Sequence, residues 1–173
     1  MAVVTVKSTA ITNVDSTPIV QNKPQISRGK RMHSIGVVTV TSGDSIGSQY
    51  RFARLRSGDR VASITAFWGA ITSAAMNLGV YDVNGGAAVV SPNFATGAQA
   101  LFASAQSIAS ANTPGGASLT YAVTSLANAE KRVWELLGFT ADPGKEYDLT
   151  ATLTAAATAT AQLAVHLDAI ANG

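Results

Sequence analysis

Short stretches of alternating apolar and polar residues run along most of this chain. The clearest pair lies within Asp59–Val90, where every second residue of Ala62–Trp68 and of Met76–Asp82 is apolar or able to line a core. Side chains of an extended strand point alternately to the two faces of a sheet, so each stretch can bury one face. Asn84-Gly85-Gly86 follows at once. These residues accept positive φ cheaply, so we expect residues 87–90 to turn back onto the second strand.

The same two-residue period predicts strands on both sides of this pair. Ile35–Thr41 is a run of β-branched residues, and Gln49–Leu55 alternates aromatic and charged residues until the phase slips at Ala53. Residues 119–123 alternate in the same way. Turn residues separate these stretches at intervals of roughly ten residues, as in an all-β domain.

The Ala- and Thr-rich end of the chain is also predicted to be extended. Residues 147–154 and 162–168 place Thr or another polar residue at many alternate positions. Thr in this pattern is unfavourable in a helix and favourable in a strand. We expect the two stretches to form a closing hairpin with its turn near residues 156–159.

Two stretches carry helical spacing instead. Residues 98–108 have apolar side chains three and four positions apart, which predicts a short helix. Residues 128–138 give the stronger signal, because Asn128 can cap the start of a helix and Gly138 can supply the left-handed residue that ends it.

About eight strands and one or two short helices define the expected fold. The pattern predicts an all-β chain, an antiparallel β-sandwich of the jelly-roll kind, over residues 34–173. Residues 1–33 are polar and broken by Pro18 and Pro24, so we expect a flexible, extended N-terminal arm, with one short strand at Val3–Val6. Such an arm becomes ordered only against another surface.

Composition narrows the function classes. Charged residues make up only 13% of the 173 residues, which suggests an exterior covered by neighbours; the plainer interpretation is an Ala- and Thr-rich sheet protein. There is no Cys, which excludes disulfides and thiolate metal sites. No apolar run reaches the roughly 20 residues needed to span a bilayer. The first residues lack the layout of a secretory signal, so we expect synthesis and assembly in the cytoplasm.

Charge is distributed unevenly along the chain. Residues 23–60 hold eight basic residues and two acidic ones, whereas the rest holds four basic and eight acidic residues. Such segregation could attract other copies of the chain or an acidic surface, although solvated surface charge is the plainer explanation. Nucleic acid is not expected, because no aromatic residues interleave the basic cluster. The candidate partner-binding residues are Lys23, Arg28, Lys30, Arg31, Arg51, Arg54, Arg56 and the aromatic Tyr81.

One catalytic pattern is present. Residues 43–47 fit G-x-S-x-G around Ser45, with Asp148 and His166 later in the order of an α/β-hydrolase. The residues that follow predict a strand rather than a helix, so we interpret the pattern as a turn and expect no enzyme. His33 and His166 are the only histidines, and no metal-ligand spacing occurs, so we expect no metal and no cofactor.

Four segments carry a resemblance to a known family: LGVYDVNGGAAV (78–89), LFASA (101–105), VWELLG (133–138) and ADPGKEYDL (141–149). They resemble a family of tailed-bacteriophage head decoration, or cement, proteins, over roughly residues 59–155. The resemblance implies a β-sandwich bound to the outside of the capsid in the virion. It also implies that the major capsid protein and further copies of the chain are its partners, and that it has no enzymatic activity.

Other function classes remain open. A phage tail, fibre or carbohydrate-binding module would use exposed aromatics such as Tyr81 to line a groove. A small jelly-roll capsid subunit is also compatible with this length.

If residues 1–33 lie along the capsid or an adjacent copy, deleting them should lower the occupancy of the protein on particles and leave the fold intact. Circular dichroism checks the fold, and co-sedimentation with particles measures occupancy. Unchanged occupancy would refute a binding role for the arm.

Overall fold

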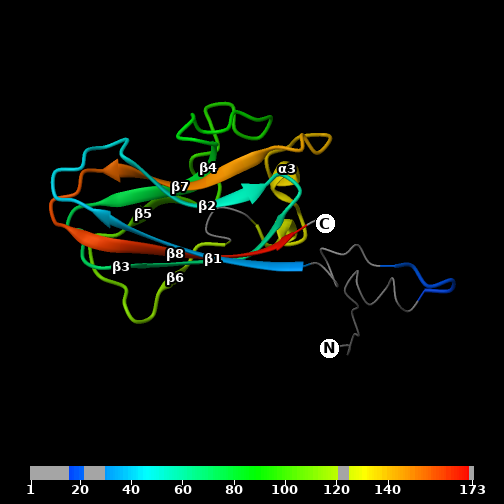
Figure 1. The fold of residues 1–173 in the computed structure, drawn as a ribbon, viewed down its shortest axis with the longest axis horizontal. Coiled ribbons are helices and arrows are strands. Elements are labelled where there is room, and N and C mark those ends of the chain that lie inside the picture. Colours follow the sequence, from blue (N-terminus) through cyan, green and yellow to red (C-terminus); the bar gives the residue numbers. More distant parts are fainter. Residues whose placement is uncertain (1–15, 22–29, 121–124, 172–173) are drawn as a thin grey trace, which may run out of the picture.

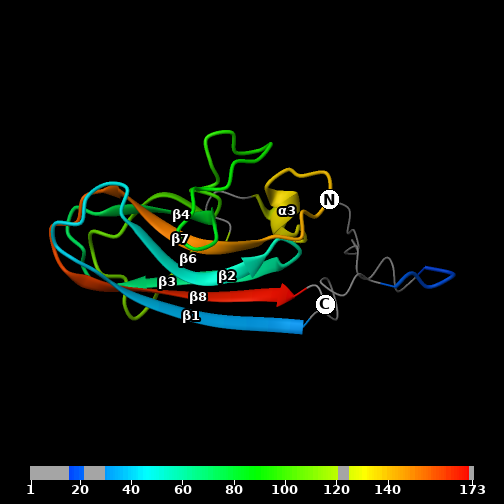
Figure 2. The same cartoon turned by 45° about the horizontal axis from the view of Figure 1, so that its top comes forward.

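The computed structural model describes residues 16–21, 30–120 and 125–171. Within them the chain forms two antiparallel sheets, with strand orders β1-β8-β3-β6 and β2-β7-β4-β5. Figures 1 and 2 show these sheets as two layers packed face to face, so the predicted all-β sandwich is confirmed. The order is that of an eight-stranded jelly roll. The elements are β1 Lys30–Val40, β2 Gln49–Arg56, β3 Arg60–Trp68, β4 Ala75–Asp82, β5 Ala103–Ser107, β6 Ala117–Ser118, the 3₁₀ helix η1 Leu126–Asn128, α3 Val133–Leu136, β7 Glu146–Ala155 and β8 Ala161–Ala171.

The core lies between the two layers and follows from the alternation. In β8 the side chains of Leu163, Val165 and Leu167 are fully buried, and Leu149 and Leu153 of β7 face them from the opposite sheet. Burial of an aliphatic side chain of this size contributes about 1.5–3 kcal/mol.

The turn predicted after β4 is present. Asn84 and Gly85 have φ values of 62° and 78°. The Asp82 N–H donates to the Ala87 carbonyl at 2.9 Å, and the Val89 N–H donates to Val80 at 3.1 Å. Residues 87–89 therefore do return along β4, as expected from residues that accept positive φ.

The helix predicted for residues 98–108 is wrong. Ala103–Ser107 is instead strand β5, which pairs with β4. Ala105 has φ 48°, and its N–H donates to Asn77 Oδ1 at 2.7 Å, a bond that fixes the chain on the neighbouring strand. Pairing with the sheet edge outweighs the helix propensity of the alanines.

The closing hairpin is also wrong in its pairing. The chain does turn between Ala155 and Ala161, but β7 and β8 belong to different sheets. The connection therefore crosses from one layer to the other. Alternation places one face of each strand in the core whether β7 and β8 pair as a hairpin or lie in different sheets. The pattern therefore could not distinguish these two arrangements.

The second predicted helix is shorter than expected. It covers Val133–Leu136 only, and Asn128 lies in η1 rather than at its start. The Val133 and Trp134 N–H groups donate to the carbonyls of Asp59 and Ser57, so the loop between β2 and β3 satisfies the first turn of the helix. Gly138, with φ 84°, ends it as predicted.

The body begins earlier than the predicted boundary at residue 34. β1 starts at Lys30, so the residues from Lys30 to His33 belong to the sheet rather than to the arm. A deletion that tests the arm should therefore end at residue 29. The predicted strand Val3–Val6 and residues 121–123 lie outside the described residues.

Gly36 marks where the two sheets meet at one edge of the sandwich. A Cβ at this position would lie 2.6 Å from the Phe52 carbonyl oxygen and 2.9 Å from Phe52 Cα in β2. These are backbone atoms of the facing sheet, so a side chain here would separate β1 from β2.

We predict that Gly36→Ala lowers the free energy of unfolding by about 1–3 kcal/mol, the usual cost of overpacking a core. Urea denaturation provides the measurement. Gly115→Ala is the matched control, since its nearest neighbour would be the Asn112 carbonyl at 3.8 Å. Equal stabilities for the two variants would contradict the close approach.

Candidate protein-binding face

The candidate site is the side of the sheet β1-β8-β3-β6 that faces away from the core, here called the β1 face. Its residues alternate with the core residues of the same strands, and the strand register arranges them in rows across β1, β8 and β3. His33, Asp168 and Ser63 form one such row. The β1 face consists of Arg31, His33, Ile35, Val37 and Thr39 of β1, Gln162, Ala164, His166 and Asp168 of β8, and Ser63, Thr65 and Phe67 of β3.

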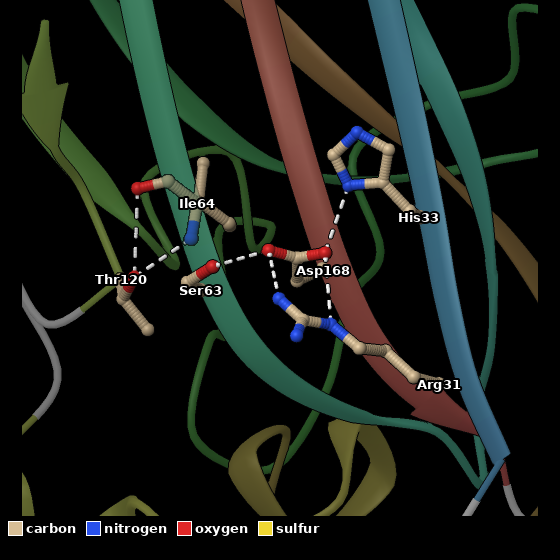
Figure 3. Close-up of polar contacts among 6 residues, drawn as sticks. All are labelled: Arg31, His33, Ser63, Ile64, Thr120 and Asp168. Atoms are coloured by element: carbon tan, nitrogen blue, oxygen red, sulfur yellow. Dashed lines mark hydrogen bonds and ion pairs between the residues drawn. The ribbon is translucent and has the colours of Figure 1, made fainter.

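Asp168 is the charged centre of this face (Figure 3). Its Oδ2 accepts from Arg31 Nη2 at 2.9 Å and from Ser63 Oγ at 3.0 Å. Its Oδ1 lies 3.3 Å from Arg31 Nε and 2.8 Å from His33 Nδ1. The hydrogen bonds from Arg31 and then His33 hold the pKa of Asp168 well below its usual range. The carboxylate therefore ties the edge strand β1 to β8 and β3.

A bulge in β3 makes the Ser63 contact possible. The pairing of β3 with β8 shifts register between Val61 and Ser63. Further along β3, Thr120 Oγ1 accepts from the Ile64 N–H at 2.7 Å, so a side chain satisfies this backbone N–H of β3 next to the short strand β6 (Figure 3). A bulge changes the direction of nearby side chains, and the bulge between Val61 and Ser63 directs the Ser63 hydroxyl at Asp168.

The other half of the β1 face is apolar and exposed. Ile35 and Val37 are 55% and 57% exposed. Beside them the rings of Phe67 and His166 lie with centroids 4.9 Å apart. A depression of about 400 Å³ adjoins this patch and is lined by Val37, Phe67, Trp68, Gly69, Thr113, Gln162 and Ala164.

In the other sheet, the outward side of β4 and β7 is covered by the chain itself, whereas outward arginines of β2 are exposed. A side chain at Gly79 would overlap the Ala98 carbonyl and the backbone of Gln99, so the connection between β4 and β5 packs directly onto β4. Figures 1 and 2 show this connection, in green, rising from the layer that contains β4 and β7. Outward-pointing Thr150 of β7 is completely buried.

This cover corrects the prediction for Tyr81. The sequence indicated a partner-binding aromatic, but Tyr81 is only 3% exposed. Its hydroxyl lies 2.5 Å from Thr152 Oγ1 on the neighbouring strand. Tyr81 therefore packs within the subunit and is not presented to a partner.

Two of the predicted basic residues meet on a single carboxylate. Asp148 of β7 is 2.5 Å from Arg51 Nη2 and 3.1 Å from Arg54 Nε, and it accepts the Asn84 N–H at 3.1 Å. A bulge between Arg51 and Ala53 puts both arginines on the same side of β2. This bulge coincides with the break in alternation at Ala53 that is visible in the sequence.

The remaining predicted residues do not join this cluster. Arg56 lies 3.7 Å from Glu146, and Arg31 pairs with Asp168 on the opposite sheet. Lys30 is exposed at the start of β1. Lys23 and Arg28 lie outside the described residues. The basic residues are thus spread over both sheets rather than gathered in one patch.

The hydrolase pattern does not assemble into a site. Ser45 lies in the turn between β1 and β2, where Asp44 Oδ2 accepts from the Thr41 N–H at 2.8 Å. Asp148 and His166 point outward from different sheets, on opposite sides of the sandwich.

The same described ranges contain neither a metal-binding cluster nor a membrane-spanning helix. No group of three or more His, Cys, Asp or Glu side chains there is arranged to hold a metal ion. The helices in these ranges are single turns, and none of them could span a bilayer.

The strand order places the chain in the class of eight-stranded jelly rolls, an architecture that includes viral capsid and lectin domains. No family model and no curated protein sequence matches the chain. Among solved structures, it is similar to a chain of the cyanophage Pam1 capsid asymmetric unit, with a TM-score of 0.55 and 16% identity. The match covers 83% of this chain and 86% of that one, so the two have similar lengths and the similarity extends over most of the fold.

We predict that Asp168→Asn lowers stability at neutral pH by about 1–3 kcal/mol, through loss of charged hydrogen bonds. Because folding lowers the pKa of Asp168, its stabilisation is present above the ordinary value of about 3.9 and declines as pH falls below it. The stability difference between wild type and variant, measured by urea unfolding, should therefore shrink from pH 7 to pH 3. A difference independent of pH would contradict the assigned role.

Proposed function

We propose that this protein is a structural component of a phage particle, a decoration or cement protein that binds the outside of the capsid through the β1 face. The observation that carries the proposal is the difference between the two outward sides of the sandwich. On one side the subunit's own β4–β5 connection covers β4 and the exposed side chains of β2 are polar or charged, whereas the other side exposes the aliphatic Ile35 and Val37. Exposed aliphatics on a firmly paired sheet are typical of a protein contact.

The fold comparison supports the same role. The similar chain is part of a capsid asymmetric unit and has nearly the same length. A jelly roll offers broad, firmly paired sheet faces, which suits a protein that acts by occupying a surface. We infer the major capsid protein and neighbouring copies of this chain as partners, and the virion as the location.

The contact surface combines two kinds of interaction. Ile35 and Val37 supply apolar area, and the cluster of Arg31, His33 and Asp168 beside them is polar. An apolar centre with a polar border is the usual anatomy of a protein interface. The contacts of Arg31 and His33 with Asp168 hold β1 to β8, the strand against which the aliphatic pair is presented.

A small shell-forming capsid subunit is the second candidate, favoured by the same strand order. The two roles differ in self-assembly. Purified shell subunits would form closed particles by themselves, visible in electron micrographs. A decoration protein would stay dispersed until capsids are added.

We predict that the double variant Ile35→Ser, Val37→Ser binds particles at least roughly tenfold more weakly, since each loses burial worth about 1–3 kcal/mol. Binding is measured by co-sedimentation with heads that lack the protein. Because both side chains are already exposed, the melting temperature should change little.

Ile46→Ser is the matched control. Ile46 is 68% exposed in the β1–β2 turn, away from the β1 face. Its substitution should leave particle binding unchanged. Equal binding by the double variant and wild type would refute the β1 face as the contact.

A further inference from the structure

The outer edge of β1 is a second surface feature, distinct from the β1 face. In an antiparallel sheet, every second residue of an edge strand directs its N–H and C=O groups away from the one strand with which it pairs. Among the described residues β1 pairs with β8 alone, and the backbone of the described loops makes no hydrogen bond to it. Figure 2 shows β1, in blue, as the border of its layer. The described part of the chain therefore leaves a row of backbone donors and acceptors on this edge without strand partners.

The other edge strands of the two sheets are protected against pairing, and β1 is not. β6 has only two residues, and β5 has five, with a shift in its register against β4. β2 contains the bulge between Arg51 and Ala53 and carries three arginines. β1 has eleven residues in continuous register with β8 and contains no proline. Short length, bulges and charge are the usual devices that keep a sheet edge from pairing with another chain, so β1 has the character of an edge that does pair.

β2 does not occupy this edge. It approaches β1 at Gly36, where a Cβ would lie 2.6 Å from the Phe52 carbonyl oxygen. A Cβ points out of the plane of a sheet, whereas the groups that pair strands lie in that plane. The contact with β2 is therefore on the core-facing side of β1, and among the described residues the in-plane side remains accessible to another strand.

The sequence of β1 is self-complementary in the antiparallel direction. A pair of β1 strands centred on Ile35 places the two isoleucines opposite each other and Val37 opposite His33. Arg31 then lies opposite Thr39, so the basic residues of the two strands are at opposite ends of the pair. A parallel pair would instead place Arg31 beside Arg31, and neighbouring like charges are unfavourable. Charge and apolar surface thus both favour a second antiparallel β1 as the partner of this edge.

We propose that β1 pairs with β1 of a second copy of the chain, which joins two sheets into one across a twofold axis at Ile35. Such an interface is isologous, because the same residues contribute from both copies. A single strand pair buries less area than a standard protein interface, so the dimer is reversible, with a dissociation constant of roughly micromolar order.

The dimer also enlarges the β1 face. Hydrogen bonds between paired strands lie in the plane of the sheet, so Ile35 and Val37 of both copies stay on the outward side and form one continuous apolar patch. The pairing follows from the edge itself, whereas the use of the doubled patch on a capsid rests on the proposed function.

Cysteine cross-linking tests the pairing, because the chain has no cysteine of its own. Opposite residues of an antiparallel pair have Cα atoms about 4.5–5.5 Å apart, a separation that a disulfide can span. Ile35→Cys should therefore give a covalent dimer as the main product of mild oxidation. Ile35 is 55% exposed, so the substitution should leave the circular dichroism spectrum unchanged.

Val37→Cys is the matched control. Val37 is 57% exposed on the same side of the same strand, but its two copies would be four residues apart across the axis. That separation of about 14 Å is too long for a disulfide, so this variant should stay monomeric on oxidation. A one-to-one mixture of the His33→Cys and Val37→Cys proteins should give a mixed covalent dimer. The mixture tests the same register if Ile35→Cys fails to fold.

The wild-type chain should also associate without any cross-link, with an average mass in sedimentation velocity that rises toward the dimer as concentration increases. Sedimentation as a monomer at every concentration up to about 1 mM would overturn the proposal. Equal cross-linking of Ile35→Cys and Val37→Cys would overturn it as well, because two β1 faces in contact through their apolar patches would give that result.

A folded Ile35→Cys protein that forms no covalent dimer would indicate another occupant of the edge, such as residues 1–29 of a neighbouring copy, and would also overturn the proposal. All of these measurements use isolated protein. Their failure is therefore distinguishable from a failure of the Ile35→Ser, Val37→Ser double variant to weaken binding to particles.

Discussion

Both sheets depend on the last two strands of the chain. β7 is the central strand between β2 and β4, and β8 is the central strand between β1 and β3. Neither sheet can be completed until the C-terminal residues arrive, and every pairing they make closes a long loop. Such non-local pairing slows folding, because the edge strands β1 and β2 are held by residues more than ninety positions away.

The central positions of β7 and β8 also explain where the charged residues meet. Along the sequence the basic residues precede the acidic ones, which suggested a bipolar molecule. The topology places basic β1 beside β8 and basic β2 beside β7, so each of these edge strands meets carboxylates of its neighbour. Asp168 contacts Arg31 and His33, and Asp148 contacts Arg51 and Arg54. Basic and acidic residues that are separated in the sequence therefore neutralise each other in the fold, because the pairs β1–β8 and β2–β7 join distant parts of the chain.

What could be predicted from the sequence is what depends on local pattern. Period-two alternation located most strands, and the phase slip at Ala53 coincides with a real bulge. Strand pairing could not be predicted, because β7 and β8 bury one face in either arrangement. The start of α3 was missed because carbonyls of Ser57 and Asp59 satisfy its first turn, a contact made across the fold. Tyr81 was misjudged for a related reason: its outward position is covered by the chain's own connection.

The β1 face also had a sequence signal that alternation alone obscured. In β1, Val38 and Val40 turn toward the core, while Ile35 and Val37 turn away from it. A strand apolar on both sides is typical of strands covered on both faces. In β7, by contrast, the subunit itself covers the outward side, and the outward-pointing Thr150 is fully buried. β1 has the composition of a doubly covered strand, but among residues 16–21, 30–120 and 125–171 only its core-facing side is covered. This pattern is the physical reason for the proposal that another molecule covers the second face.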